Sequence, residues 1–139
     1  MILLDTNVIS EPMRRTPDMT VVSWLNRQVN TALFTTSITV MELQFGVARL
    51  EEGKRKANLR EVLDYTLSRL IDYRLLPFDT TAAIAAARIA ATAESNGTRI
   101  GQADCQIAAI GRSHGFVIAT RDVEPFKRAG LVVINPWTE

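Results

Sequence analysis

The sequence contains almost none of the residues that build disulfides and zinc sites. It has one cysteine, Cys105, and one histidine, His114, among 139 residues. A single cysteine excludes an internal disulfide and fits a reducing compartment. The two residues together are too few for a Cys/His zinc site. Any metal ion bound by this chain must therefore be held by oxygen ligands.

Long apolar runs and a strong net charge are also absent. No segment approaches the ~18 apolar residues that a membrane helix requires, and the N-terminus lacks the basic region and cleavage site of a secretory signal. We therefore expect a cytoplasmic protein with no membrane association. A formal net charge of +1 gives no global basic field of the kind that marks many nucleic-acid-binding proteins. Two local basic runs, Arg14–Arg15 and Lys54–Lys56, are either phosphate contacts or solvated surface.

The chain is long enough for one domain with a proper core, so residues 1–139 are expected to form a single domain. Short apolar runs alternate with helical patterns, which predicts an α/β fold whose parallel sheet is covered on both faces. Strands are expected at 2–4, 32–36, 74–78, 116–120 and 131–134. Helices are expected at 8–11, after 17–18, at 37–50 with Ser37 or Thr39 as cap, and at 58–70, 79–94, 100–114 and 123–127. Pro12, Gly53, Gly97 and Gly115 are expected to end helices.

Two aspartates directly follow predicted strands, where the active sites of open α/β sheets lie. Asp5 ends the run Ile2–Leu4, which suits a central strand, and Asp122 follows the strand at 116–120. If these strands are neighbours, both carboxylates meet at one edge of the sheet. Each aspartate is also placed to cap the short helix that follows it, so capping remains an alternative for both.

Asp104 lies on the apolar stripe of its predicted helix. Ile100, Ile107 and Ala108 are its neighbours one turn away, and positions at this spacing share a helix face. An ionised carboxylate that faces a core costs several kcal/mol unless it is paired or bound to a metal. We therefore expect Asp104 to have a partner.

Glu42 lies one turn into the helix that follows the second predicted strand, with Ile38, Phe45 and Gly46 on the same stripe. A glycine inside a helix costs about 1 kcal/mol relative to alanine. Its presence predicts that something approaches the helix closely at Gly46. Taken alone, Glu42 is explained equally well as an ordinary acid on a helix surface.

The four carboxylates together predict a cation site. All of them can face the carboxyl edge of one sheet, where they would repel one another unless cations were present. Mg²⁺ or Mn²⁺ prefers oxygen ligands and keeps several waters, which leaves room for a substrate phosphate. Such an ion can activate a bound water and stabilise charge that develops on phosphorus, so a phosphodiester is the expected substrate class.

Several motifs resemble those of PIN-domain ribonucleases, close to the VapC-type toxins of bacterial toxin–antitoxin modules and their FitB-like members. The motifs are LLDTNVIS at the start, SITVMELQFGVARL after the second strand, then GQADCQIAAIGRSHG, VIATRD and the terminal INPW. Each is weak alone, but their order and spacing are specific. The resemblance covers essentially the whole chain.

The resemblance implies a three-layer α/β fold with a parallel sheet of about five strands, and Mg²⁺- or Mn²⁺-dependent cleavage of RNA. It also implies a homodimer held inactive by a small antitoxin with a DNA-binding domain, whose tail lies across a groove of the toxin. The catalytic and metal-binding residues that it implies are Asp5, Glu42, Asp104 and Asp122, supported by Asn7 and Thr120. In this reading Glu42 either ligates the ion or orients the attacking water.

Other functions are weighed against this one. A co-repressor that cleaves RNA weakly or not at all, and works mainly as an antitoxin-bound dimer on operator DNA, remains the alternative. A phosphoacceptor receiver domain is disfavoured because Asp5 has no acidic neighbour and Arg121 stands where a late-strand lysine is needed. A D-x-D phosphatase is disfavoured because Asn7 replaces the second aspartate. The apolar helix surface around 59–70 belongs either to the core or to a partner interface.

Overall fold

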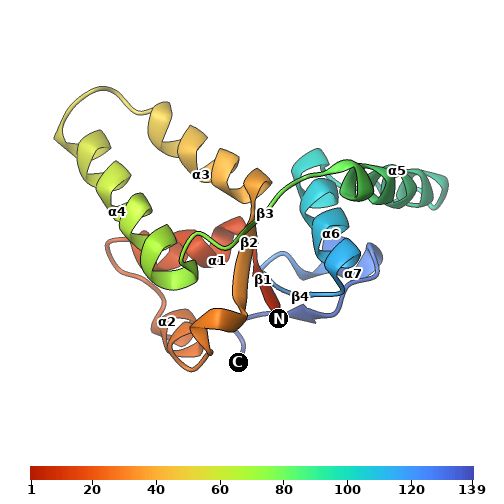
Figure 1. The fold of residues 1–139 in the computed structure, drawn as a ribbon, viewed down its shortest axis with the longest axis horizontal. Helices are drawn as coiled ribbons and strands as arrows, with labels where there is room; N and C mark the ends of the chain where they lie inside the picture. The colour runs from red at the N-terminus through yellow and green to blue at the C-terminus, as the bar shows by residue number, and fades with distance from the viewer.

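The computed structural model describes all 139 residues and contains one five-stranded sheet in the order β3-β2-β1-β4-β5. Every pairing between neighbouring strands is parallel. The central strand β1 is the run Ile2–Leu4 that the sequence suggested for this place (Figure 1). The other strands are β2 (Leu33–Thr36), β3 (Leu75–Leu76), β4 (Val117–Ala119) and β5 (Val133–Ile134).

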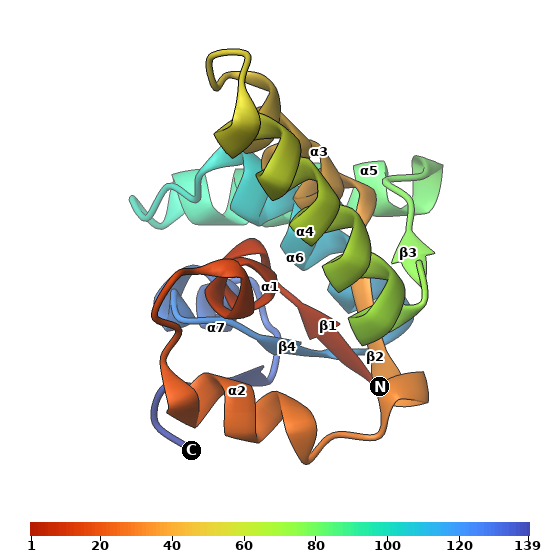
Figure 2. The same cartoon turned by 90° about the vertical axis from the view of Figure 1, so that its left-hand side faces the viewer.

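Seven helices cover the two faces of this sheet, so the predicted three-layer α/β architecture is confirmed (Figure 1). Figure 2 looks onto the face covered by α1, α2 and α4. No helix is both long and apolar enough to cross a lipid bilayer. The helices are α1 (Thr6–Ser10), α2 (Met19–Asn26), α3 (Ser37–Ala48), α4 (Lys54–Ile71), α5 (Thr80–Ser95), α6 (Gln102–His114) and α7 (Val123–Arg128), with short 3₁₀ turns at Glu11–Met13 and Asn30–Ala32.

The central strand separates two hydrophobic cores. Successive side chains of a strand point to opposite faces. Leu4 accordingly packs with side chains from α1 to α4 on one face. Leu3 packs with side chains from α5, α6 and α7 on the other. Because β1 is buried on both faces, it is continuously apolar until Asp5 emerges at the carboxyl edge.

Some boundaries differ from those predicted. Helix α4 begins at Lys54 rather than near Asn58, because its first turn is exposed and polar and so carries no apolar periodicity. Strand β3 has only two of the five residues expected at 74–78. Pro12 does not end helical structure but lies in the 3₁₀ turn Glu11–Met13 that follows α1. At the start of a helical turn the missing N–H of proline costs no hydrogen bond.

The caps also differ in part from those expected. Asp79, the first residue of the helix expected at 79–94, caps α5 by accepting a hydrogen bond from Ala82 N at 2.9 Å. Gly115 ends α6 as predicted, with a φ of 68° that favours glycine. Helix α3 is capped by neither Ser37 nor Thr39. Instead the hydroxyl of Thr36, the last residue of β2, accepts from Thr39 N at 3.0 Å.

Candidate functional site

Four carboxylates gather at the carboxyl edge of the sheet, and we call them the acidic cluster. Each comes from a different segment of the chain. Asp5 ends β1, and Asp122 follows β4, the strand that pairs with β1. The negative charges of Glu42 and Asp104 raise the pKa of Asp5, and those of Asp122 and Glu42 raise the pKa of Asp104. The structure therefore brings together all four acids that the sequence nominated: Asp5, Glu42, Asp104 and Asp122.

Asp5 is the most enclosed member of the cluster, with 4% of its surface exposed. Its Oδ1 accepts from Thr6 N at 2.8 Å, and its Oδ2 accepts from the Thr120 hydroxyl at 2.7 Å and from Asn7 Nδ2 at 3.5 Å. Burial raises its pKa to about 6, although the hydrogen bonds from Thr120 and Thr6 work in the opposite direction. Asp5 thus both caps α1 and belongs to the cluster.

Asn7 and Thr120, the predicted supporting residues, tie the loop after β4 to the start of α1. Asn7 Oδ1 accepts from Arg121 N at 3.2 Å, while its Nδ2 lies 3.4 Å from the Thr120 hydroxyl. That hydroxyl, besides donating to Asp5, accepts from Asp122 N at 3.0 Å. The two side chains therefore fix the relative positions of Asp5 and Asp122.

Two threonines that the sequence reasoning missed lie beside Glu42, and one of them, Thr6, holds it. The Thr6 hydroxyl donates to Glu42 Oε1 at 2.7 Å and lies 3.3 Å from the Thr39 hydroxyl. Glu42 is half-buried and engaged by this hydrogen bond, which distinguishes it from an ordinary acid on a solvated helix surface. The signal for Thr6 was its place between Asp5 and Asn7, and the signal for Thr39 was its place one helical turn before Glu42.

Asp104 and Asp122 are held by no side chain of the protein. Asp104 lies in the first turn of α6 and is half-buried, so the expectation of a core-facing position is only partly right. Neither carboxylate takes part in an ion pair with a lysine, arginine or histidine. Asp122 occupies the N-cap position of α7, but its side chain makes no capping hydrogen bond, so the capping alternative is wrong for this residue.

The oxygen donors of the cluster fit a hydrated Mg²⁺ or Mn²⁺. No three acidic, histidine or cysteine side chains stand close enough together to enclose a cation by themselves. Mg²⁺ commonly binds through one or two carboxylates and keeps several waters, so a partly open acidic cluster suits it better than a closed cage. Burial is the main reason why the pKa values of Asp5 and Asp104 are raised, and the neighbouring carboxylates raise them further. A cation would favour the ionised form of both groups.

Gly46 was predicted to allow a close approach, and within this chain that prediction is wrong. A Cβ atom built on Gly46 meets nothing within 4 Å. The glycine is exposed, so it leaves this part of α3 open to molecules outside the chain.

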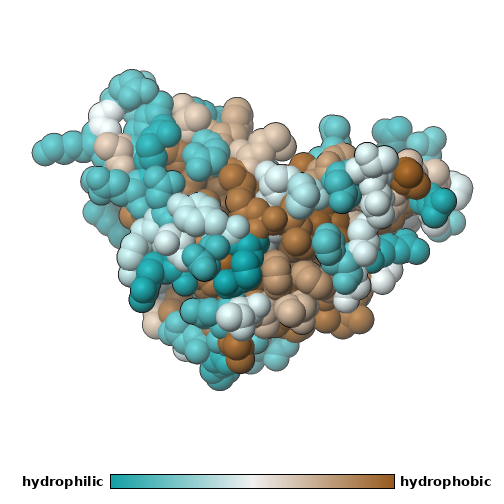
Figure 3. Space-filling view, viewed as in Figure 1, coloured by the Kyte–Doolittle hydropathy of each residue, from teal (hydrophilic) through white to brown (hydrophobic).

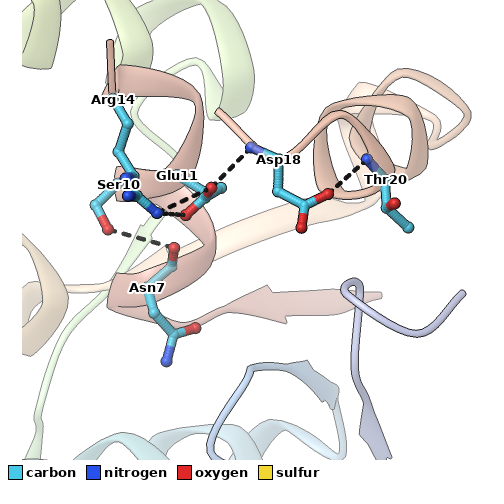
Figure 4. A network of polar contacts seen from close by, with 6 residues as sticks. All are labelled: Asn7, Ser10, Glu11, Arg14, Asp18 and Thr20. Carbon is cyan, nitrogen blue, oxygen red and sulfur yellow. Dashed lines mark hydrogen bonds and ion pairs between the residues drawn. The ribbon is translucent and has the colours of Figure 1, made fainter. Parts of the chain in front are cut away.

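A further acid, Glu11, is buried but has a different role. It is 4% exposed and accepts from Asp18 N at 2.8 Å, while Arg14 Nη1 lies 3.4 Å away (Figure 4). Asp18 in turn accepts from Thr20 N at 2.9 Å and caps α2. Glu11 therefore joins the 3₁₀ turn after α1 to the start of α2 and is satisfied without a cation site.

Comparisons with known proteins agree with this architecture. Plasmid stability protein StbB of Pseudomonas syringae pv. tomato is 47% identical over 137 residues, which are 99% of each chain. VapC ribonuclease Y4jK of Sinorhizobium fredii and toxin FitB of Neisseria gonorrhoeae are each 44% identical over 137 residues, which cover 99% of this chain and 98% and 99% of theirs.

Solved structures agree as well. The crystal structure of FitAcB from Neisseria gonorrhoeae superposes with a TM-score of 0.93 at 44% identity, with both chains fully covered. The structure of FitAB bound to an IR36 DNA fragment gives 0.91 at 43% identity, covering 99% of this chain and 96% of that one. The family model for the PIN domain matches residues 2–131. The resemblance seen in the sequence is thus confirmed, and the chain belongs to the PIN-domain family.

Proposed function

We propose that this chain is an endoribonuclease that uses Mg²⁺ or Mn²⁺ at the acidic cluster to hydrolyse RNA phosphodiesters, and that it is the toxin of a toxin–antitoxin pair. One observation carries the proposal. Four carboxylates from four chain segments gather at one sheet edge, and none is within ion-pair distance of a basic side chain. The names of two relatives, a VapC ribonuclease and a toxin, support the substrate and the role. The single free cysteine suits the reducing cytoplasm in which we expect the protein to act.

Each acid has a part in this proposal. A bound divalent ion would supply Lewis-acid activation of water and stabilise charge on the phosphate. Asp5, Asp104 and Asp122 would hold it, in part through its bound waters, with Asp5 fixed by its hydrogen bonds from Thr6 and Thr120. Glu42 has one carboxylate oxygen engaged by the Thr6 hydroxyl. Its other oxygen is left to ligate the ion or to accept a proton from the attacking water.

The proposed antitoxin has a place to dock. A groove of about 780 Å³ runs between the end of α1, α3 and α4. Its floor is largely apolar and includes the exposed backbone of Gly46, and three arginines line it. Such a groove fits an amphipathic segment with acidic side chains, and FitAB bound to DNA supports an assembly with a DNA-binding partner. Its lining includes the side chains of Met13, Arg14, Arg15, Leu43, Val47, Arg55, Leu59 and Val62.

A homodimer is also part of the proposal. Figure 3 shows apolar surface over the middle of the molecule, between the α3–α4 side and the α5–α6 side. Met41 and Phe45 on α3 and Ile84 on α5 are among the exposed apolar side chains of the chain. Contiguous apolar surface of this kind is typical of protein–protein contacts.

The alternative is a weakly cleaving or inactive co-repressor that acts mainly as an antitoxin-bound dimer on operator DNA. The structure of FitAB bound to a DNA fragment favours it. It predicts the same partner and the same fold but no need for a complete acidic cluster. The two functions make different predictions about whether the isolated protein cleaves RNA.

The deciding experiment is a cleavage assay on the protein freed from its co-purified partner, with Mg²⁺ or Mn²⁺ and with EDTA. We expect metal-dependent cleavage that Asp104→Asn reduces at least ~100-fold, since losing a group that stabilises transition-state charge has effects of this size. Glu61→Gln, which changes an exposed acid on α4, is the matched control and should cleave like wild type. Cleavage by Asp104→Asn at the wild-type rate, or cleavage that persists in EDTA, would overturn the proposal.

A further inference from the structure

We propose that Arg121, held against the ring of Trp137, binds a backbone phosphate of the RNA strand next to the acidic cluster. This inference rests on the proposed function. It assigns a substrate-binding role to a residue that lies beside the cluster but contributes no carboxylate to it.

The backbone of Arg121 is fixed on both sides. Its N–H donates to Asn7 Oδ1 at 3.2 Å. The residue before it, Thr120, donates to Asp5 Oδ2 at 2.7 Å, and the residue after it, Asp122, donates its N–H to the Thr120 hydroxyl at 3.0 Å. The point from which the arginine side chain leaves is therefore set relative to Asp5 and Asp122.

The side chain of Arg121 is oriented by an aromatic ring from the C-terminal segment. Its Cζ lies 5.1 Å from the centroid of the Trp137 ring. Trp137 is itself held, because its N–H donates to Asn135 Oδ1 at 3.0 Å and its ring packs on the core that α1–α4 share. The N–H groups of a guanidinium lie in its plane. A ring that covers its face therefore leaves these donors free to bind other groups.

Those donors have no partner within the chain. The Arg121 guanidinium makes no hydrogen bond and no ion pair, although Asp122 is its neighbour in sequence. Arg14, Arg74 and Arg112 use their guanidinium groups within the chain. Arg121 shares its free donors with the other surface arginines and differs from them in its place directly before Asp122 of the acidic cluster. Arg121 is thus an oriented cation with unused donors at an edge that otherwise carries negative charge.

A phosphodiester backbone is the ligand that this arrangement fits. The four carboxylates repel an RNA strand, and a cation beside them offsets that repulsion where the strand must approach. The planar fork of a guanidinium matches two phosphate oxygens at once, which an ammonium group cannot do. We assign Arg121 to a phosphate beside the one that is cleaved, because the carboxylates themselves occupy the reacting position.

The test measures the affinity of the full-length protein for a fluorescently labelled single-stranded RNA in EDTA, over a series of salt concentrations. Arg121→Gln should weaken binding at least ~5-fold and lower the slope of log K against log salt by about 0.7, the value for one phosphate contact on a single strand. Arg121→Lys should recover the slope but only part of the affinity, because the charge remains and the fork is lost. Arg128→Gln removes the same charge from the last turn of α7, away from the cluster, and should bind within 2-fold of wild type.

Cleavage kinetics supply the second readout. Arg121→Gln should raise KM and leave kcat within about 3-fold, as expected when binding to the ground state and the transition state is weakened equally. Wild-type binding by Arg121→Gln, or equal losses in Arg121→Gln and Arg128→Gln, would overturn this inference while leaving the nuclease proposal standing. If the wild-type protein neither binds nor cleaves RNA, the proposed function fails and this inference fails with it.

Discussion

The acidic cluster consists of two unlike pairs of carboxylates. Asp5 and Glu42 are held by hydroxyl and amide donors from α1 and from the loop after β4. Asp104 and Asp122 make no hydrogen bond through their side chains and no ion pair. The first pair is positioned by the fold itself, whereas the second is left free to adjust its position. In the proposed function, the cluster would combine rigid and adaptable oxygen donors around a cation.

The largest effect that separates the pairs is expected at Asp5. Its pKa of about 6 lies above the ordinary value of 3.8, so the folded state holds the proton more tightly than the unfolded state. Between about pH 4 and 6 the folded state therefore binds more protons, and stability falls as the pH rises. Above that window, without metal, the ionised Asp5 opposes folding by about 3 kcal/mol, from about 1.4 kcal/mol per pKa unit.

Asp5→Asn removes that charge, so we expect the metal-free variant to be more stable than wild type by about 1–3 kcal/mol at pH 7.5. The gain should disappear below about pH 4, where Asp5 is protonated in both states. Urea unfolding in EDTA at several pH values measures this, and the same variant should lose RNA cleavage. A variant that is less stable than wild type at pH 7.5 would show that the hydrogen bonds to Asp5 outweigh the cost of burying its charge.

The positions of some of these acids could be predicted from the sequence, and those of others could not. The meeting of Asp5 and Asp122 follows from parallel strands that are neighbours, and the apolar run before each acid is visible in the sequence. Asp104 was expected to be more buried than it is. Periodicity gives the direction in which a side chain points from a helix axis, but not how far the first turn of α6 projects beyond the sheet.

The hydroxyl partners could not be predicted in the same way. Thr6 reaches Glu42 only because α1 packs on α3, a tertiary contact between segments 36 residues apart in sequence. Gly46 misled for a related reason. The cost of a glycine to a helix is a local property, whereas close packing against it depends on tertiary structure, and no part of this chain lies within 4 Å of a Cβ built on Gly46.

Thr6→Val tests whether the hydroxyl contact makes Glu42 part of the rigid pair. The substitution keeps the shape of the side chain and removes the donor to Glu42 Oε1. We expect cleavage to fall about 10-fold, equivalent to about 1.4 kcal/mol, with little change in RNA affinity. The Michaelis parameters of Thr6→Val and Thr6→Ser give the answer, because serine retains the hydroxyl and should restore kcat. Equal kcat values in wild type, Thr6→Val and Thr6→Ser would show that Thr6 has no role in the site.

Added metal should act on Asp104 and Asp122, the two carboxylates without hydrogen bonds or ion pairs. A ligand that binds only the folded state adds about 1.4 kcal/mol of stability at ten times its dissociation constant, which corresponds to about 3–6 °C in Tm for a chain of this size. We expect Mg²⁺ or Mn²⁺ to raise the Tm of wild type by this amount and to raise that of Asp104→Asn by much less. Ca²⁺ and a matched increase in ionic strength are the controls, since simple screening of repulsion would raise the Tm of both proteins alike.

The smallest effect concerns the caps. Asp79 and Asp122 both precede a helix, but only Asp79 uses its side chain as a cap, accepting from Ala82 N at 2.9 Å. We expect Asp79→Ala to cost about 1 kcal/mol of stability and Asp122→Ala to change it by less than about 0.5 kcal/mol. Denaturant titrations of the two metal-free variants measure the difference. A cost at Asp122 as large as that at Asp79 would mean that Asp122 supports α7 after all, and it would then belong with the rigid pair and not with Asp104.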